Sequence, residues 1–371
     1  MLGKPTPRIK IKVVLFGPLL TAVSGVSTHI NMLFASDLAR NCNLMHFQIG
    51  SEGREESTIK KLARVFFSPL YLAYFLLRHR PDIVHLNTSL EPKPFWRDAI
   101  YLLIAKWLRG KVVYQVHGGD LPGDFLCAHP LLKVVFKRFL QLPDAIVLLA
   151  EVERRAYESF GRFKVLQVIP NAVDIDEYFV RESKRYDSDR LRLVYMGRLA
   201  DNKGIFDAIE SLHILQDQGM ENFVLSIAGS GPAEQALRAK VRELKLADYV
   251  DFVGPIFGEA KVEFWRRAEL FVFPTFHCEG LPYAVLESIA SGTPIVTTRV
   301  GGIIDVITDG VHGVFVEPHD ALALAATIKM LALNRPKLRE MSEACVSRAH
   351  EHYSIDRLSR QFSDLYETVL K

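Results

Sequence analysis

The feature of this sequence that most constrains its fold is an alternation of short apolar runs with longer segments of helical spacing, repeated through both halves of the chain. Runs of Val, Ile and Leu bounded by turn residues are typical of strands buried on both faces. Their alternation with helices predicts an α/β fold with doubly wound sheets. The predicted strands are 11–16, 44–48, 83–86, 111–116, 145–149 and 164–169, followed by 191–196, 223–228, 250–253, 270–273, 294–297 and 313–316.

The division of these strands into two sets predicts two sheets and therefore two cores. A chain of 371 residues exceeds the usual size of one domain. The most polar stretch between the two sets is Arg181–Arg190, and Pro170-Asn171 marks the end of the first set. We therefore predict a first domain of residues 1–173 and a second domain that begins at residue 174.

The most informative motif is PTFHCEGLPYAVLE, at residues 274–287, directly after a predicted strand. Pro282 suits the first turn of a helix, because the N–H group that proline lacks has no partner there. Glu279 would lie in a loop and Glu287 in the helix, where free N–H groups attract an anion and carboxylates accept hydroxyl protons. A diphosphate joined to sugar and ribose hydroxyls fits such a site. Judged by spacing alone, two glutamates eight residues apart more often consist of one carboxylate that caps a helix and one that is solvated.

Two cations and a histidine follow other predicted strands. Arg198 and Lys203 come after strand 191–196, at the edge where doubly wound sheets bind ligands. Two fixed cations there could offset the charge of a departing nucleoside diphosphate, and a solvated basic pair is the alternative. His117 follows strand 111–116. A purely structural histidine is the alternative at that position.

The run EGLPYAVLE, at residues 279–287, resembles the E-x7-E signature of the group 1 retaining glycosyltransferases, family four, which have the GT-B fold. The likeness continues in the family's order along most of the chain, which argues against chance. The further matches are Ile169-Pro170-Asn171 with Val173-Asp174, Gly197-Arg198-Leu199 with Lys203-Gly204, Gly229-Ser230-Gly231-Pro232, Val253-Gly254, Gly292-Thr293-Pro294, Gly301-Gly302 and Asp309-Gly310.

The loop after the first predicted strand departs from the family pattern. It leads to a helix predicted to begin near Ser27, and its N–H groups, at Gly25 among others, could approach a phosphate or the acceptor. The family commonly has two adjacent glycines where this chain has Ser24-Gly25. The path of this loop is therefore left open.

The resemblance implies two Rossmann-like domains that face each other across a cleft. Residues 1–173 would bind the acceptor, residues 174–354 would bind the nucleotide sugar, and a final helix at 355–371 would pack back on the first domain. The implied reaction is the retaining transfer of a hexose-type sugar from a UDP- or GDP-sugar to a glycan or lipid-linked acceptor, in cell-surface polysaccharide or glycolipid synthesis. The alternatives are a nucleotide-sugar epimerase, hydrolase or phosphorylase of the same fold, or a non-catalytic membrane-associated relative.

The resemblance also implies roles for single residues. Glu279 would bind the hydroxyls of the donor sugar, Glu287 would bind the ribose, and His117 would lie beside the transferring sugar. With Arg198 and Lys203, His117 and Glu279 form the predicted catalytic group. The predicted donor-binding residues are Gly25, Gly197, Val253, Gly254, Gly280, Leu281, Pro282 and Glu287, with Val253 and Gly254 against the base.

We expect no cofactor and no metal. Asp187-Ser188-Asp189 imitates a D-x-D metal motif, but it lies in the polar linker without evident ligand partners, and the four cysteines form no C-x-x-C pair. Arg198, Lys203 and a helix N-terminus can supply the electrostatic stabilisation that a cation supplies elsewhere.

The charge of the chain is unevenly distributed. Residues 1–175 carry 23 Lys and Arg against 14 Asp and Glu, although the whole chain has a net charge of only +3. Within this half, basic residues flank an apolar and aromatic stretch at 59–80, and residues 132–139 repeat the pattern. Such segments are typical of helices that lie among lipid headgroups, whereas an apolar stripe at helical spacing is more often core.

We therefore expect a cytoplasmic protein that docks on an anionic membrane surface and has no nucleic-acid partner. The apolar stretch 65–77 is shorter than the roughly 18 residues of a membrane-spanning helix.

Overall fold

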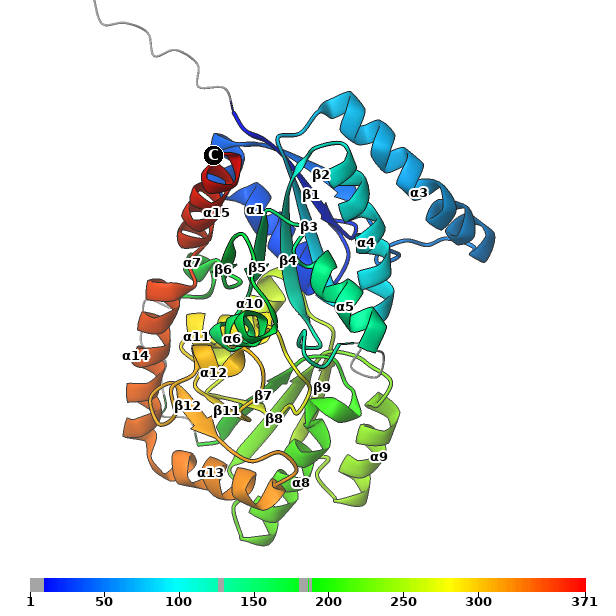
Figure 1. Ribbon diagram of the computed structural model, residues 1–371. Helices are drawn as coiled ribbons and strands as arrows, with labels where there is room; N and C mark the ends of the chain where they lie inside the picture. Colours follow the sequence, from blue (N-terminus) through cyan, green and yellow to red (C-terminus); the bar gives the residue numbers. More distant parts are fainter. Residues whose placement is uncertain (1–9, 126–129, 180–185, 187–188) are drawn as a thin grey trace, which may run out of the picture. The chain divides into compact units, whose positions relative to one another are not determined.

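The computed structural model describes residues 10–125, 130–179, 186 and 189–371, which form two compact units (Figure 1). The first unit comprises the chain up to Ala172 together with Ile355–Lys371, and the second comprises Val173–Ser354. Among the described residues, each unit contains a parallel sheet of six strands, with helices packed against it. The predicted α/β architecture of two doubly wound sheets is therefore confirmed.

The sheet of the first unit has the strand order β2-β1-β3-β4-β5-β6. The chain builds outward from β1 in one direction and from β3 in the other, so the topological switch point lies between β1 and β3. The strand bounds are β1 Lys12–Gly17, β2 Asn43–Gln48, β3 Ile83–Leu90, β4 Lys111–Gly119, β5 Ala145–Leu148 and β6 Leu166–Val168.

Two hydrophobic cores cover the two faces of this sheet, because successive strand residues point to opposite faces. In β1, Val13 and Leu15 face one core while Val14 and Phe16 face the other. The first core includes α1, α2 and α15, and the second includes α3, α4, α5 and α6. The helix bounds are α1 Gly25–Ala35, α2 Asp37–Asn41, α3 Thr58–His79, α4 Pro92–Trp107, α5 Pro130–Phe139, α6 Glu151–Phe160 and α15 Ile355–Leu370.

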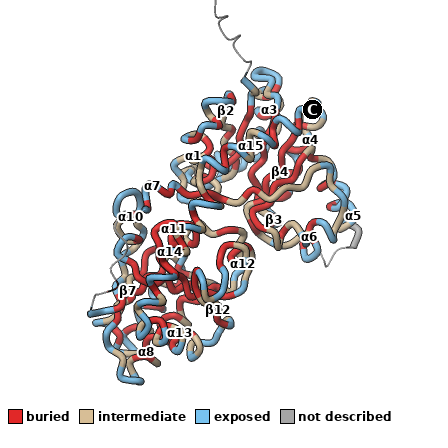
Figure 2. Tube along the Cα trace, turned by 90° about the vertical axis from the view of Figure 1, so that its left-hand side faces the viewer, coloured by how far each residue is buried: buried red, intermediate tan, exposed pale blue. Residues whose placement is uncertain are grey.

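The sheet of the second unit has the order β12-β11-β10-β7-β8-β9, with its switch point between β10 and β7. Buried residues gather around its sheet (Figure 2), and β10 and β11 are buried at every position. The strand bounds are β7 Leu191–Met196, β8 Phe223–Ala228, β9 Val250–Gly254, β10 Leu270–Phe273, β11 Ile295–Thr297 and β12 Gly313–Phe315. The helix bounds are α7 Ile175–Tyr178, α8 Ile205–Asp217, α9 Glu234–Glu243, α10 Gly258–Arg267, α11 Tyr283–Ala290, α12 Ile303–Val306, α13 Ala321–Leu333 and α14 Arg335–His352.

Two details of the first unit differ from the sequence prediction. Strands β3 and β4 continue past their predicted ends to Leu90 and Gly119, so that His117 lies on a strand. Helix α1 begins at Gly25 and not near Ser27, because the Ser24 hydroxyl oxygen accepts a hydrogen bond from the Ser27 N–H at 3.2 Å and caps the helix. In the described part of the chain, no helix is long and apolar enough to cross a membrane.

Candidate active site

The carboxyl edge of the second sheet collects most of the predicted donor-site residues. Because its strands are parallel, the loops that follow β7, β9 and β10 all start at this edge. Gly197 and Arg198 follow β7, Val253 and Gly254 end β9, and the loop with Glu279 follows β10. The edge next to the switch point is where doubly wound sheets bind ligands.

An ion pair joins the two loops at this switch point. The Lys203 ammonium donates a hydrogen bond to Oε1 of Glu279, and each of the two side chains is only 14% exposed. The Thr275 hydroxyl donates to the same oxygen at 3.3 Å. Arg198 is exposed, and it has no ion pair with any residue that the structure describes. The loops thus present one cation held in place by a carboxylate and a second that is available to an anion.

The backbone holds Glu279 in position from both sides. Gly204 has a φ of +68°, and a Cβ atom there would lie 1.9 Å from the Pro274 carbonyl oxygen, so only glycine allows the two loops to approach this closely. From the other side, the N–H of Gly302 donates to the carbonyl oxygens of Glu279 and Gly280, at 3.1 and 2.9 Å. The carboxylate therefore sits on a loop that is already ordered.

Glu287 lies in α11 and is only 4% exposed. Its Oε1 accepts a hydrogen bond from the Lys261 ammonium at 2.6 Å, and its Oε2 accepts one from the Trp265 indole N–H at 3.0 Å. The alternative of a solvated carboxylate is therefore wrong for Glu287. The alternative of a helix cap is wrong for Glu279, because α11 begins at Tyr283 without a side-chain cap.

The remaining predicted donor residues surround open space or support the loop. Val253 is 45% exposed, and a Cβ atom added to Gly254 would meet nothing within 4 Å, which leaves room for a planar base. Leu281 is buried and Pro282 stands directly before α11. The roles assigned to these residues stay predictions. Lys261 and Trp265, which contact Glu287, carry no motif by which the sequence could have marked them.

In the first unit, His117 is held by Asn87. The Asn87 side-chain N–H donates to the Phe16 carbonyl oxygen at 2.9 Å, so its other atom, Oδ1, must accept from Nε2 of His117, 2.8 Å away. The proton of His117 is therefore on Nε2, and Nδ1 keeps its lone pair. Burial, together with the nearby His29 and His85, holds the pKa of His117 well below its usual value. A neutral imidazole with an acceptor nitrogen can accept a hydrogen bond from a sugar hydroxyl.

Two further histidines lie behind His117, and the sequence did not mark them as a group. The His29 and His117 rings meet edge to face, with centroids 4.9 Å apart. His85 lies 2.7 Å from the Tyr366 hydroxyl of α15 and 3.0 Å from Oε1 of Gln115. Burial lowers the pKa of His29 to about 4 and, with the charge of His29, the pKa of His85 to about 3. The network therefore keeps neutral imidazoles inside the first unit.

No group of three or more His, Cys, Asp or Glu side chains suited to a metal ion occurs among the described residues. The D-x-D imitation cannot be placed, because Asp187 and Ser188 lie outside them. Cys278, beside Glu279, is exposed. The expectation that catalysis needs no metal stays a prediction.

Two family profiles match the chain in succession. Residues 48–177 match Glycosyltransferase Family 4, and residues 176–351 match Glycosyl transferases group 1.

Proteins of known name are similar over much of the chain. WcaL of Salmonella typhimurium, a protein assigned to colanic acid biosynthesis as a glycosyltransferase, is 27% identical over 71% of this chain and 65% of its own length. The GDP-mannose-dependent alpha-(1-6)-phosphatidylinositol monomannoside mannosyltransferase of Mycolicibacterium smegmatis is 26% identical over 66% of each chain. The chain thus spans slightly less than two thirds of the length of these curated relatives.

The fold agrees with these matches. Anabaena HepE, solved in complex with UDP-glucose, superposes with a TM-score of 0.75 at 15% identity, over 96% of this chain and 100% of its own. Two successive family profiles, an E-x7-E motif at the switch point and this GT-B likeness agree with one another. The chain therefore belongs to the group 1 glycosyltransferases of family four, with the GT-B fold.

Proposed function

We propose that this protein is a retaining glycosyltransferase that moves a hexose-type sugar from a UDP- or GDP-sugar to a glycan or lipid-linked acceptor. The observation that carries this proposal is the Lys203–Glu279 ion pair at the switch point, on the same loop that carries the exposed Arg198. The names of relatives support the donor and product classes. They include a mannosyltransferase that depends on GDP-mannose, a colanic acid glycosyltransferase and a fold relative that binds UDP-glucose.

The arrangement suits transfer without a protein nucleophile. As the bond between the sugar and the diphosphate breaks, negative charge develops on the leaving phosphate, and Arg198, Lys203 and the open N-terminus of α11 can stabilise it. Glu279 holds Lys203 and can accept hydrogen bonds from sugar hydroxyls. The acceptor oxygen attacks on the face that the diphosphate leaves, and its proton passes to the departing phosphate. This front-face path retains the configuration at the sugar carbon.

A panel of UDP- and GDP-sugars tests the proposal. One class of nucleotide sugar is expected to raise the melting temperature, and the rise is expected to grow with the logarithm of the ratio of ligand concentration to dissociation constant. The same donor is expected to be hydrolysed slowly when no acceptor is present. Release of the nucleotide together with glycosylation of an added acceptor separates transfer from epimerisation, which releases no nucleotide. Dependence on inorganic phosphate would indicate a phosphorylase. Absence of binding by every donor would contradict the proposal.

Removal of metal ions is expected to leave this activity largely intact, because we propose that Arg198 and Lys203 supply the positive charge that a metal ion would otherwise supply to the diphosphate. The measurement is turnover in EDTA, compared with turnover after Mn²⁺ or Mg²⁺ is added back. A loss on chelation that either ion reverses would show that the cations are insufficient.

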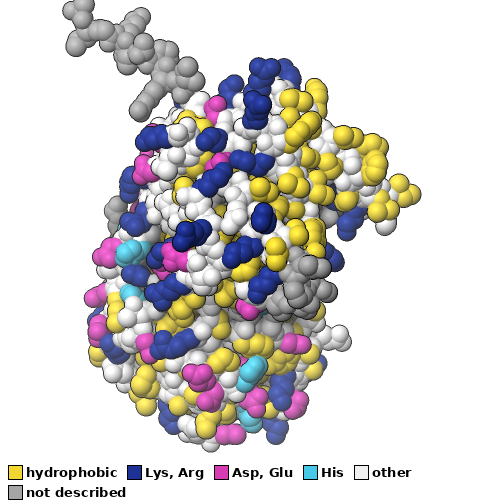
Figure 3. Space-filling model, viewed as in Figure 1, with side chains coloured by type: hydrophobic (Ala, Val, Ile, Leu, Met, Phe, Trp, Pro, Cys, Tyr) yellow, Lys and Arg dark blue, Asp and Glu magenta, His cyan; other side chains and the backbone are white. Residues whose placement is uncertain are grey.

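We also propose that the first unit docks on an anionic membrane through α3. Only two residues of this helix, Leu72 and Leu76, are buried, so core packing accounts for only part of its apolar stripe. Large apolar side chains gather over α3 and α4 beside Lys and Arg residues (Figure 3). The exposed apolar residues of α3 are Ile59, Leu62, Val65, Phe66, Phe67, Leu70, Tyr71, Tyr74 and Leu77. Exposed apolar surface of this kind marks interaction sites.

The residues that form the proposed membrane-docking surface differ from the predicted ones in two respects. Arg64 is bound to Glu56 and Ser51, so Lys60 and Lys61 supply the free charge at the start of α3. In the predicted second segment at 132–139, Phe136 and Phe139 belong to the core and only part of α5 is exposed. Helix α4 contributes instead, with a stripe that the sequence prediction missed although its helical spacing was readable. This stripe consists of Trp96, Ile100, Leu103 and Trp107.

Co-sedimentation with liposomes tests the membrane proposal. Binding is expected to increase with the fraction of anionic lipid and to fall with salt. It is expected to weaken about 30-fold or more when Lys60 and Lys61 are changed to Glu, since each of the two basic residues at the surface is worth roughly 1 kcal/mol. The variant Arg155→Glu/Arg162→Glu alters two exposed arginines of the same unit and is the matched control. Wild-type protein that ignores anionic vesicles at low salt would contradict docking.

A further inference from the structure

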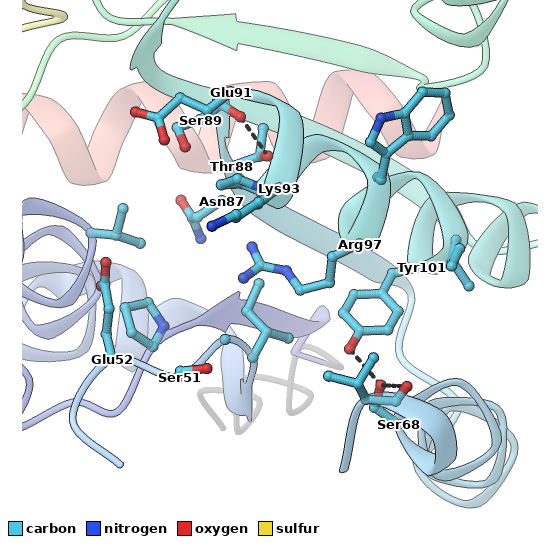
Figure 4. A pocket seen from close by; sticks show the side chains of 18 of the residues that line it. Ser51, Glu52, Ser68, Asn87, Thr88, Ser89, Glu91, Lys93, Arg97 and Tyr101 are labelled. Atoms are coloured by element: carbon cyan, nitrogen blue, oxygen red, sulfur yellow. Dashed lines mark hydrogen bonds between the residues drawn. The ribbon is translucent and has the colours of Figure 1, made fainter. Parts of the chain in front are cut away.

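A cavity of about 890 Å³ opens in the first unit, between α3, α4 and the carboxyl ends of the first three strands. It adjoins the β1/β3 switch point, where a sheet of this topology binds ligands. Asn87 lines the cavity and also holds His117, so a ligand that fills the cavity lies near the predicted position of the transferring sugar. Its wall combines fixed charges, hydroxyl groups and apolar side chains (Figure 4).

Arg97 is a positive charge that is held in a fixed orientation in the wall of this cavity. Its Nε and Nη2 donate to the two carboxylate oxygens of Asp98 at 2.7 and 2.8 Å. Asp98 is completely buried and also accepts from the Thr88 hydroxyl at 2.7 Å. The remaining nitrogen, Nη1, faces Gly50, where a Cβ atom would lie 2.9 Å from it. Arg97 is therefore a pre-oriented guanidinium, and such a group binds phosphate with defined geometry.

Other polar groups converge on Arg97. Figure 4 shows the guanidinium of Arg97 pointing into the cavity near the amine of Lys93 and the amide of Asn87. Glu52 and Glu91 also line the cavity. Cations beside carboxylates and hydroxyls suit a head that carries both an anionic group and sugar-type hydroxyls.

The apolar part of the wall does not end inside the cavity. Val65, Trp96 and Ile100 line it, yet they are 58%, 48% and 49% exposed, so the same side chains also belong to the apolar face of α3 and α4. A fully polar ligand would leave this surface in water, whereas a hydrocarbon chain that leaves the cavity here would cover it. Burial of apolar surface is favourable in proportion to its area.

We propose that this cavity binds the anionic, phosphate-bearing head of an amphiphilic lipid-linked acceptor, with Arg97 on the phosphate and the hydrocarbon chain leaving between α3 and α4. This inference rests on the proposed function and names the acceptor class for it. It also links catalysis to the membrane face, because the cavity opens among the side chains that would lie in the bilayer.

Binding of decyl phosphate, measured by calorimetry below its micellar concentration, is the direct test. Decyl phosphate is expected to bind at least tenfold more tightly than inorganic phosphate, glucose 6-phosphate or uncharged decyl maltoside. The variant Arg97→Gln is expected to lose about tenfold in affinity for decyl phosphate and to keep its affinity for decyl maltoside. Arg155→Gln, which removes an exposed arginine outside the cavity, is expected to bind like wild type.

A second variant guards against misfolding, since Arg97→Gln leaves Asp98 buried without its main partner. Lys93 is exposed on the rim of the cavity, so Lys93→Glu does not disturb the core and is expected to weaken decyl phosphate binding several-fold. Unchanged affinity in both folded variants would overturn the site. Equal affinity for glucose 6-phosphate and decyl phosphate would overturn the lipid part of the proposal.

Failure of this inference is distinguishable from failure of the proposed function. The rise in melting temperature on addition of the nucleotide sugar reports on donor binding by the second unit. This rise is expected to be the same in Arg97→Gln as in wild type. If wild type shows no shift with any donor, the proposed function fails. If the shift is present but decyl phosphate binding does not depend on Arg97 or Lys93, only the cavity assignment fails.

Discussion

Replacement of Lys203 by Ala is expected to reduce the turnover of sugar transfer about 100-fold or more. The substitution removes a pre-oriented cation next to the leaving diphosphate, and one such stabiliser is worth on the order of 3 kcal/mol in a transition state. It also leaves the largely buried Glu279 carboxylate without its ion-pair partner, which places uncompensated negative charge at the site. Arg198→Ala is expected to have a similar effect on turnover with less effect on stability, because Arg198 is exposed.

The measurement is kcat at saturating donor, with melting temperature as the check on folding. Arg242→Ala removes an exposed arginine of α9 in the same unit and serves as the matched control. The double variant Lys203→Ala/Glu279→Gln separates two explanations. If removal of the Glu279 charge restores most of the turnover, Lys203 acts by neutralising Glu279. Near-normal turnover in both Lys203→Ala and Arg198→Ala would contradict the catalytic assignment.

Acidification from pH 7.5 to 5.5 is expected to lower the free energy of unfolding by about 4 kcal/mol. Burial depresses the pKa values of His29, His85 and His117 in the folded protein, whereas an unfolded histidine has a pKa near 6.5. A histidine whose pKa is lowered in the folded protein contributes its full stabilisation above pH 6.5. This contribution is lost as the pH falls from 6.5 toward the pKa of the folded protein, because only the unfolded chain takes up the proton. Each histidine contributes about 1.4 kcal/mol over this interval. Burial also lowers the pKa values of His46 and His312, which therefore change the stability in the same direction.

Urea denaturation at the two pH values, followed by tryptophan fluorescence and circular dichroism, measures this loss. His29→Leu replaces a buried imidazole by an apolar side chain and is expected to remove about one third of the contribution of the three histidines. His350→Gln alters an exposed histidine and is the control. An unfolding midpoint that is the same at pH 7.5 and pH 5.5 would show that the buried histidines do not titrate on unfolding.

The strands were predictable because their signals are local. A strand buried on both faces reads as a continuous apolar run, and β1 shows why, since Val13 and Val14 face different cores. The ends of β3 and β4 were not predictable, because Asn87, Thr88 and His117 are polar residues that stay in the sheet through hydrogen bonds to distant partners. Local composition contains no record of those partners.

The candidate site was likewise only partly predictable from the sequence. The E-x7-E run, Arg198 and Lys203 could be identified from the sequence, because each stands in a short motif after a predicted strand. That Lys203 binds Glu279, 76 residues away, follows from the position of β7 next to β10, which is set by the strand order of the sheet. The Tyr366–His85 contact, across 281 residues, likewise exists only because α15 packs on the first sheet.

By itself, the sequence determined the α/β class, the two sets of strands and the family, because these depend on periodicity and on contiguous motifs. Only the tertiary structure decided whether a given apolar or charged side chain is buried. The stripe of α3 has the spacing of a core helix, yet nine of its large apolar side chains are exposed, while the charged Glu287 and Asp98 are buried. The physical reason is that burial depends on which surfaces pack against one another, and these contacts are determined only by the packing of the entire unit.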